Sequence, residues 1–167
     1  MKSMQTPEQN QNEFEIRVED LKKKLPIKFT IDNVELTLQL GNPEKKVSSE
    51  NTYRANLEVI NPDQEIVGVM DGQLVLENDG LFMYCDAMSR DMASSELKGV
   101  IRKAIVELLK VGAVTAWENS TQLTKGRNSG ESMYQNLETN QQEYGIIVTV
   151  NRDPTNHDRS RYHIEKK

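Results

Sequence analysis

The chain has 167 residues, 36% of them hydrophobic, and this length can bury the core of one domain. Its net charge of -5 argues against a nucleic-acid-binding surface, and no apolar run approaches the roughly 18 residues that a membrane-spanning helix needs. The lone Cys85 excludes an intramolecular disulfide and favours a cytoplasmic location, and two histidines with one cysteine far from them in sequence do not supply a dedicated zinc site.

The N-terminal segment is polar and lacks apolar periodicity. Residues 1–12 are rich in Gln and Asn, which predicts a disordered tail. Phe14, Ile16 and Val18 then alternate with charged residues, and this alternation predicts a half-buried strand over residues 13–18. Residues 20–25 leave room for about one helical turn before a proline.

The next part of the chain reads as a series of strands separated by turns. Alternating or apolar runs predict strands over residues 27–31, 34–40, 53–60, 66–76 and 81–88. Asp71-Gly72, inside the fourth of these runs, predicts either a tight hairpin turn or a β-bulge. The last run is the most apolar, so we expect it to lie centrally in the sheet.

An amphipathic helix follows the apolar strand. Ser94 and Ser95 are good N-cap residues, apolar side chains recur at three- and four-residue spacing from Leu97 to Leu109, and Gly112 ends the pattern. Residues 113–117 form a short β-rich run. A strand, a helix and a strand in this order predict parallel pairing through a right-handed crossover.

The last 50 residues alternate between polar loops and short elements. Residues 121–130 predict a loop, residues 131–137 a short helix, and residues 144–150 and 161–164 two strands. Together the patterns predict a single α+β domain over residues 13–167. It contains a mixed, mostly antiparallel sheet of about six or seven strands, with helices on its faces.

The turn between the apolar strand and the amphipathic helix is a candidate site for binding an anionic ligand. Backbone N–H groups at a helix N-terminus form a site for an anionic group such as a pyrophosphate. Arg90 stands at the start of this turn, where it either meets phosphate charge or is a solvated turn residue. Ser94 and Ser95 either donate hydrogen bonds to phosphate or simply cap the helix.

Two stretches of this sequence resemble the GNAT acyltransferase superfamily. The segment Arg90-Asp91-Met92-Ala93-Ser94-Ser95 stands where that family has its Gln/Arg-x-x-Gly-x-Gly/Ala turn, and Ser129 to Leu137 matches a later helix that carries Met-Tyr-x-x-Leu. The order of elements from about Leu57 onward also matches. Two departures stand out: Ala93 and Ser95 replace the glycines of the turn, and the N-terminal third lacks the family's early helices.

The resemblance implies transfer of an acetyl group from acetyl-CoA to a primary amine on a small molecule or a protein. The N–H groups of Met92, Ala93, Ser94, Ser95 and Glu96, with Arg90, would bind the pyrophosphate. Tyr134 would protonate the CoA thiolate, the central strand would supply an oxyanion donor, and Asp86 on that strand would deprotonate the amine. No metal is expected.

Each of these residues also has a simpler interpretation. Tyr134 fits a half-buried aromatic on an amphipathic helix, Asp86 fits a strand-end cap, and Cys85 fits core packing on the opposite face of its strand. Trp117 fits either a ligand cleft or the core. Two alternative functions follow: a non-catalytic GNAT-like module that binds a protein or small ligand, and an interaction protein whose sheet edge pairs with a second copy as a homodimer.

Overall fold

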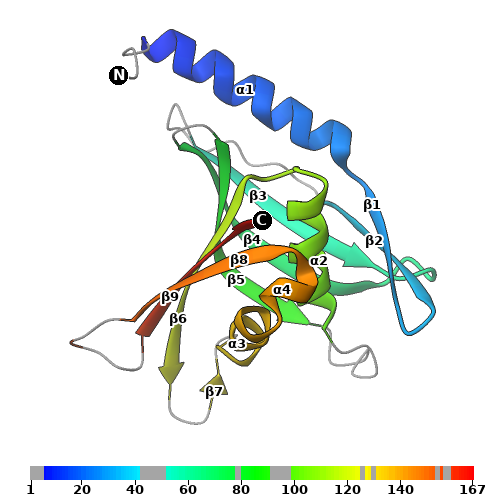
Figure 1. Ribbon diagram of the computed structural model, residues 1–167. Helices are drawn as coiled ribbons and strands as arrows, with labels where there is room; N and C mark the ends of the chain where they lie inside the picture. The colour runs from blue at the N-terminus through cyan, green and yellow to red at the C-terminus, as the bar shows by residue number, and fades with distance from the viewer. Residues whose placement is uncertain are drawn as a thin grey trace.

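The computed structural model describes residues 6–41, 52–77, 80–90, 99–124, 127–128, 131–152, 155 and 159–167. These residues form one nine-stranded mixed sheet and four helices (Figure 1). The strand order is β1-β2-β3-β4-β5-β6-β9-β8, with the short β7 paired to β6. The pairing of β5 with β6 is parallel and the others are antiparallel. The α+β class and the mostly antiparallel sheet are thus confirmed, with more strands than the six or seven predicted.

The strands are β1 (Ile27–Ile31), β2 (Val34–Leu40), β3 (Thr52–Ile60), β4 (Ile66–Glu77), β5 (Gly80–Arg90), β6 (Ala116–Thr124), β7 (Arg127–Asn128), β8 (Ile146–Arg152) and β9 (Arg159–Lys166). The helices are α1 (Pro7–Lys24), α2 (Val100–Lys110), α3 (Glu131–Thr139) and α4 (Gln141–Tyr144). No described helix has the length and apolar character needed to cross a membrane.

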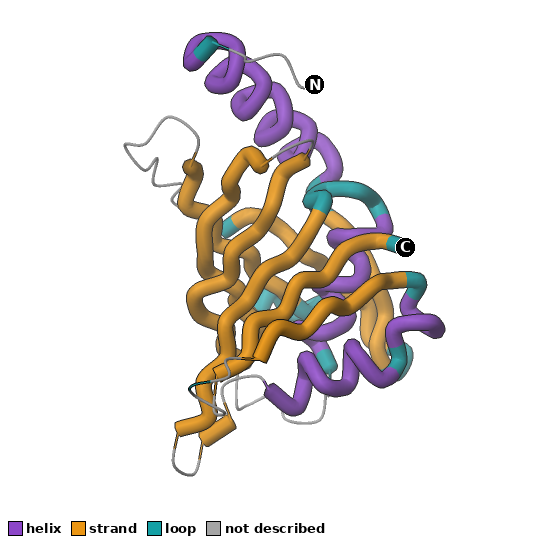
Figure 2. The backbone as a smooth tube through the Cα atoms, turned by 60° about the vertical axis from the view of Figure 1, so that its left-hand side comes forward, coloured by secondary structure: helices purple, strands orange, loops and turns teal. Residues whose placement is uncertain are grey.

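The two faces of the sheet differ in character. Side chains alternate between faces along each strand, and one set is buried across the whole sheet. We call this side the inner face; its residues include Leu57, Met70, Leu74, Met83, Trp117, Ile164 and Val148. Helix α2 packs on it, since Ile101 and Val100 lie beside Gly68 of β4. Figure 2 shows the strands in front of α2, so the opposite, outer face is turned toward the viewer.

The predicted irregularity at Asp71-Gly72 is a β-bulge rather than a hairpin turn. The register of β4 with β5 shifts there: Asp71 pairs with Ala87 and Gly72 pairs with Cys85, which leaves Asp86 without a partner on β4. A bulge inserts an extra residue into one strand and bends it. Strand β5, the predicted central strand, therefore changes direction at Asp86.

The N-terminal segment was predicted incorrectly. Residues 13–18 belong to helix α1 and not to a strand, and residues 7–12, predicted as disordered tail, are the first turns of the same helix. Thr6 caps α1 in a reciprocal capping box with Gln9. The buried side chains are Phe14, Val18 and Leu21, spaced by four and three residues, whereas Ile16 is 61% exposed. In the GNAT superfamily the early helices follow the first strand, whereas in this chain helix α1 precedes strand β1.

Helix α2 begins later than predicted. Its N-cap is Gly99, in the left-handed conformation with φ 80° and without a side-chain hydrogen bond to the cap. The predicted cap residues Ser94 and Ser95, and the predicted apolar residue Leu97, lie outside the described residues. The C-terminal end is confirmed: Gly112 has φ 72°, and its N–H and that of Ala113 bind the carbonyls of Leu109 and Leu108.

The strands after α2 are longer than predicted. β6 covers Ala116–Thr124 instead of residues 113–117, so the predicted loop from residue 121 begins as strand and includes β7. The last strand, β9, inserts between β6 and β8. Pairing on both sides explains why its polar sequence forms a strand of eight residues.

Candidate active site

The two parallel strands β5 and β6 pair only over their first residues. The register runs from Phe82–Ala116 to Cys85–Asn119 and then stops. Beyond this point β5 continues to pair with β4 as far as Arg90, and β6 continues to pair with β9 as far as Gln122 (Figure 1). Asn119 Nδ2 donates to the Cys85 carbonyl at 2.9 Å where the strands part. The two parallel strands therefore splay apart after Cys85 and Asn119.

The separation leaves part of β5 without a ladder on one side. Residues 86–90 have partners on β4 or lie in the bulge, and none of them pairs with β6. The Cys85 carbonyl points toward β6, since it accepts from Asn119. Beyond Cys85, backbone groups on this side of β5 have no ladder partner on β6.

Tyr134 of α3 lies beneath this separation on the inner face. Its side chain is fully buried, and its hydroxyl accepts a hydrogen bond from Trp117 Nε1 at 3.0 Å. The same hydroxyl donates to Met88 Sδ at 3.6 Å. Its ring stacks on Tyr162 with centroids 4.9 Å apart. The structure thus brings Tyr134 into contact with Trp117. The sequence patterns did not predict this contact.

Burial controls the protonation of Tyr134. Desolvation raises the pKa of the phenol well above its usual value, and the nearby Cys85 and Tyr162 raise it further, while the hydrogen bond from Trp117 lowers it. The phenol is therefore protonated at neutral pH. This is the state that a general acid requires.

Asp86 lies on the outer face. It is the bulged residue of β5, and its carboxylate contacts Arg54 Nη1 at 3.4 Å. Arg54 also binds Asp71 at 3.0 Å. Arg54 is an outer-face residue, because its neighbours Tyr53 and Ala55 are buried on the inner face. Asp86 and Tyr134 are thus not in contact but flank β5 from opposite faces.

The predicted pyrophosphate turn is described only in part. Arg90 is the last residue of β5, and Met92, Ala93, Ser94, Ser95 and Glu96 lie outside the described residues. Where the description resumes, Gly99 caps α2 without a side-chain hydrogen bond, and Arg102 stands in the first turn of the helix. The role of these residues in binding a diphosphate stays a prediction.

A cluster on the outer face was missed by the sequence patterns. His163 of β9 binds Glu118 of β6 through Nδ1, contacts Glu165 through Nε2 at 3.5 Å, and lies against Phe82 with ring centroids 5.6 Å apart. Alternation within each strand could have shown which side chains share a face. It could not show that β5, β6 and β9 are neighbours, because long connections separate these strands in sequence. No group of three His, Cys, Asp or Glu side chains that suits a metal ion occurs among the described residues.

The His163 cluster predicts a pH-dependent stability. Partial burial lowers the pKa of His163, but the Glu118 and Glu165 carboxylates outweigh burial and raise it above 6.5. A pKa raised on folding adds stability that is complete below the unfolded value of about 6.5 and is lost as pH rises through the folded value. Urea unfolding should therefore show the wild type losing its advantage over His163→Gln as the pH rises above about 6.5. A constant difference would contradict the pairing.

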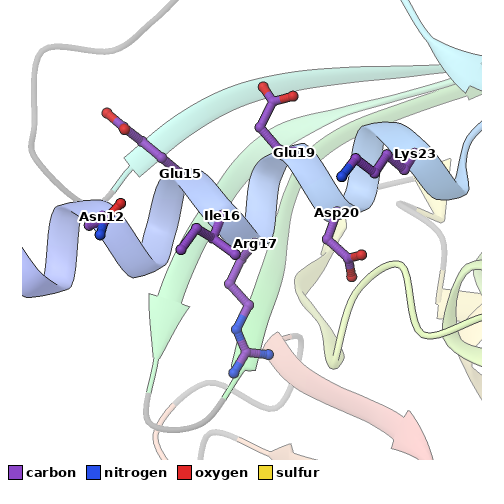
Figure 3. A pocket seen from close by; sticks show the side chains of 7 residues that line it. All are labelled: Asn12, Glu15, Ile16, Arg17, Glu19, Asp20 and Lys23. Carbon is purple, nitrogen blue, oxygen red and sulfur yellow. The ribbon is translucent and has the colours of Figure 1, made fainter.

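A shallow hollow on the surface of α1 is separate from this site. Figure 3 shows that its seven lining side chains all come from that helix: Asn12, Glu15, Ile16, Arg17, Glu19, Asp20 and Lys23. None of them is a candidate for acetyl transfer.

Comparisons with known proteins give only distant likenesses. No protein-family model matches the chain, and no curated protein matches it. Among solved structures it is similar to a presumed acetyltransferase from Agrobacterium tumefaciens, at 16% identity over 69% of this chain and 74% of that one, with a TM-score of 0.38. It is also similar to spermidine N-acetyltransferase from Vibrio cholerae in complex with CoA and spermine, at 10% identity over 68% of this chain and 66% of that one, with a TM-score of 0.39.

Likeness at this level does not identify an activity. The order of elements within the described residues is a separate observation. It contains a central strand, a long helix, a splayed parallel strand, a helix bearing Tyr134 and a final pair of strands. In this order the fold resembles that of the GNAT superfamily.

Proposed function

We propose that the protein transfers an acetyl group from acetyl-CoA to a primary amine. One observation carries the proposal: β5 and β6 separate after Cys85 and Asn119, with the protonated phenol of Tyr134 on the inner face and the carboxylate of Asp86 on the outer face. A proton donor and a proton acceptor thus flank one strand that has no partner on β6 beyond Cys85. This arrangement suits acyl transfer.

Each group of the chain has a separate task in this reaction. Asp86 removes a proton from the attacking amine, directly or through water. Amides of β5 beyond Cys85 donate hydrogen bonds to the oxyanion that develops on the acetyl carbonyl. Tyr134 donates its proton to the departing sulfur. Acetyl-CoA supplies the activated thioester.

The chemistry around Tyr134 fits a thioester in one respect. In the structure its hydroxyl already donates to a sulfur atom, that of Met88 on β5. Because Met88 Sδ holds this proton and the phenol is fully buried, the Met88 side chain must leave the phenol for the thioester to reach it. The residues present can therefore receive a sulfur after a local rearrangement of one flexible side chain.

The test of the proposal is calorimetric titration with acetyl-CoA, with turnover assayed on spermine and on a lysine amide. We propose that Arg90 and the amides of residues 92–96 bind the diphosphate. Ser95→Asp, which places a negative charge in this turn, should then weaken binding at least about tenfold. Thr30→Asp, which adds the same charge at an exposed side chain of β1, is the charge-matched control and should bind like the wild type. Absence of binding at millimolar acetyl-CoA would exclude the proposed enzymatic function.

A second function rests on the same site. The full burial of Tyr134 and the presence of Ala93 and Ser95 at glycine positions favour a non-catalytic module that binds a ligand there. Binding of acetyl-CoA without thiol release in the presence of either amine would support this second function over the first.

A further inference from the structure

We propose that Trp117 is a positioning residue that directs the proton of Tyr134 toward β5. This inference deepens the proposed function and depends on it. Trp117 lies on β6, outside the sequence motif that contains Tyr134, so the proton transfer would involve a second element of the fold.

The donor and acceptor groups of Trp117 and Tyr134 fix the direction of the phenol proton. An indole N–H is a donor only, so at the 3.0 Å contact Trp117 donates and the Tyr134 oxygen accepts. The hydroxyl hydrogen of Tyr134 cannot point at Trp117 and has to find another acceptor. The acceptor in the structure is Met88 Sδ at 3.6 Å, on the part of β5 that lies beyond the bulge and has no partner on β6.

Trp117 is well suited to hold this geometry because its indole is fully packed in the core. It is fully buried in β6, where it pairs with Met83 of β5 on one side and with Ile164 of β9 on the other. The stacked Tyr162 fixes the plane of the Tyr134 ring. The indole N–H thus occupies one side of the phenol oxygen, and the stacked ring holds the phenol so that its proton is directed at Met88 Sδ.

The same hydrogen bond makes Tyr134 a better acid. Burial raises the pKa of the phenol, which weakens it as a donor to a thiolate, and the indole N–H opposes this rise by stabilising the phenolate. Trp117 therefore affects both the direction and the driving force of the proton transfer. Trp117→Phe keeps an aromatic ring in the core but removes the N–H.

The first test reads the contact itself. Trp117 is the only tryptophan, so the protein gives one indole N–H resonance that needs no assignment. We expect this resonance to move upfield and to exchange faster with solvent in Tyr134→Phe. A resonance that coincides with that of the wild type would show that the hydrogen bond is absent in solution and would overturn the inference.

The second test reads the reaction. With acetyl-CoA and the better of the two amines, Trp117→Phe should lower kcat about tenfold or more while KM for acetyl-CoA stays within about twofold. Met83→Leu, a change of similar volume beside Trp117, is the packing control and should keep the wild-type kcat. An active wild type with unchanged kcat in Trp117→Phe would overturn the positioning role alone, whereas a wild type that binds no acetyl-CoA would overturn the proposed function.

Discussion

Replacing Gly72 by alanine should destabilise the protein by about 3 kcal/mol. An added Cβ at this position would lie 2.1 Å from the Tyr84 carbonyl oxygen and 2.9 Å from Cys85 Cα. Both are backbone atoms of β5, so neither can move without displacing the ladder that joins β4 to β5. Because the clash is at the bulge, relief of the strain would also shift Asp86.

Gly68→Ala is the matched control for this change. It adds the same atom to the same strand, but the nearest neighbours are the side-chain ends of Ile101 at 3.0 Å and Val100 at 3.3 Å. Side chains of α2 can adjust by a few tenths of an ångström, so we expect a loss well below that of Gly72→Ala, measured by urea unfolding. Equal losses would show that β5 is not held rigidly at the bulge.

The strands and the main helix were predictable where local patterns agree with tertiary packing. The alternation in β1 to β4 corresponds to one buried face, and the three- and four-residue spacing in α2 corresponds to its packed side. The prediction for the N-terminal segment was wrong because two patterns overlap there. Phe14, Ile16 and Val18 have the two-residue spacing of a strand, while Phe14, Val18 and Leu21 have the four- and three-residue spacing of a helix. Only burial distinguishes them: Ile16 is exposed and Leu21 is not.

The candidate site was predictable only in part. Tyr134 was predicted through a short motif on α3, and its role stays a prediction, whereas the apolar character of residues 81–88 correctly placed β5 centrally. The contacts of Tyr134 with Trp117 and Met88 could not be found, because they depend on how β5 and β6 part after four paired residues. A register between strands joined by a helical crossover has no local signal in sequence.

Tyr134→Phe should lower kcat by about 10²–10⁴-fold, the usual contribution of a general acid. The variant keeps the ring that stacks on Tyr162 but has no proton to give to a departing thiolate. KM for acetyl-CoA should change little, because the hydroxyl acts on the sulfur only as the thioester breaks. Steady-state kinetics with acetyl-CoA and a primary amine measure both constants.

The same substitution should also cost stability, and the two effects can be separated. Trp117 Nε1–H loses its acceptor in a fully buried position, which costs about 1–3 kcal/mol. Tyr144→Phe removes a partly buried hydroxyl of α4 that donates to Asn136 Oδ1 of α3 at 3.4 Å, so it controls for the loss of a phenol and should leave kcat unchanged. A Tyr134→Phe protein that is less stable but equally fast would mean that the hydroxyl serves only the core. A slower enzyme assayed well below its unfolding temperature would place the hydroxyl in the reaction, because an unfolded fraction alone cannot account for a loss of this size.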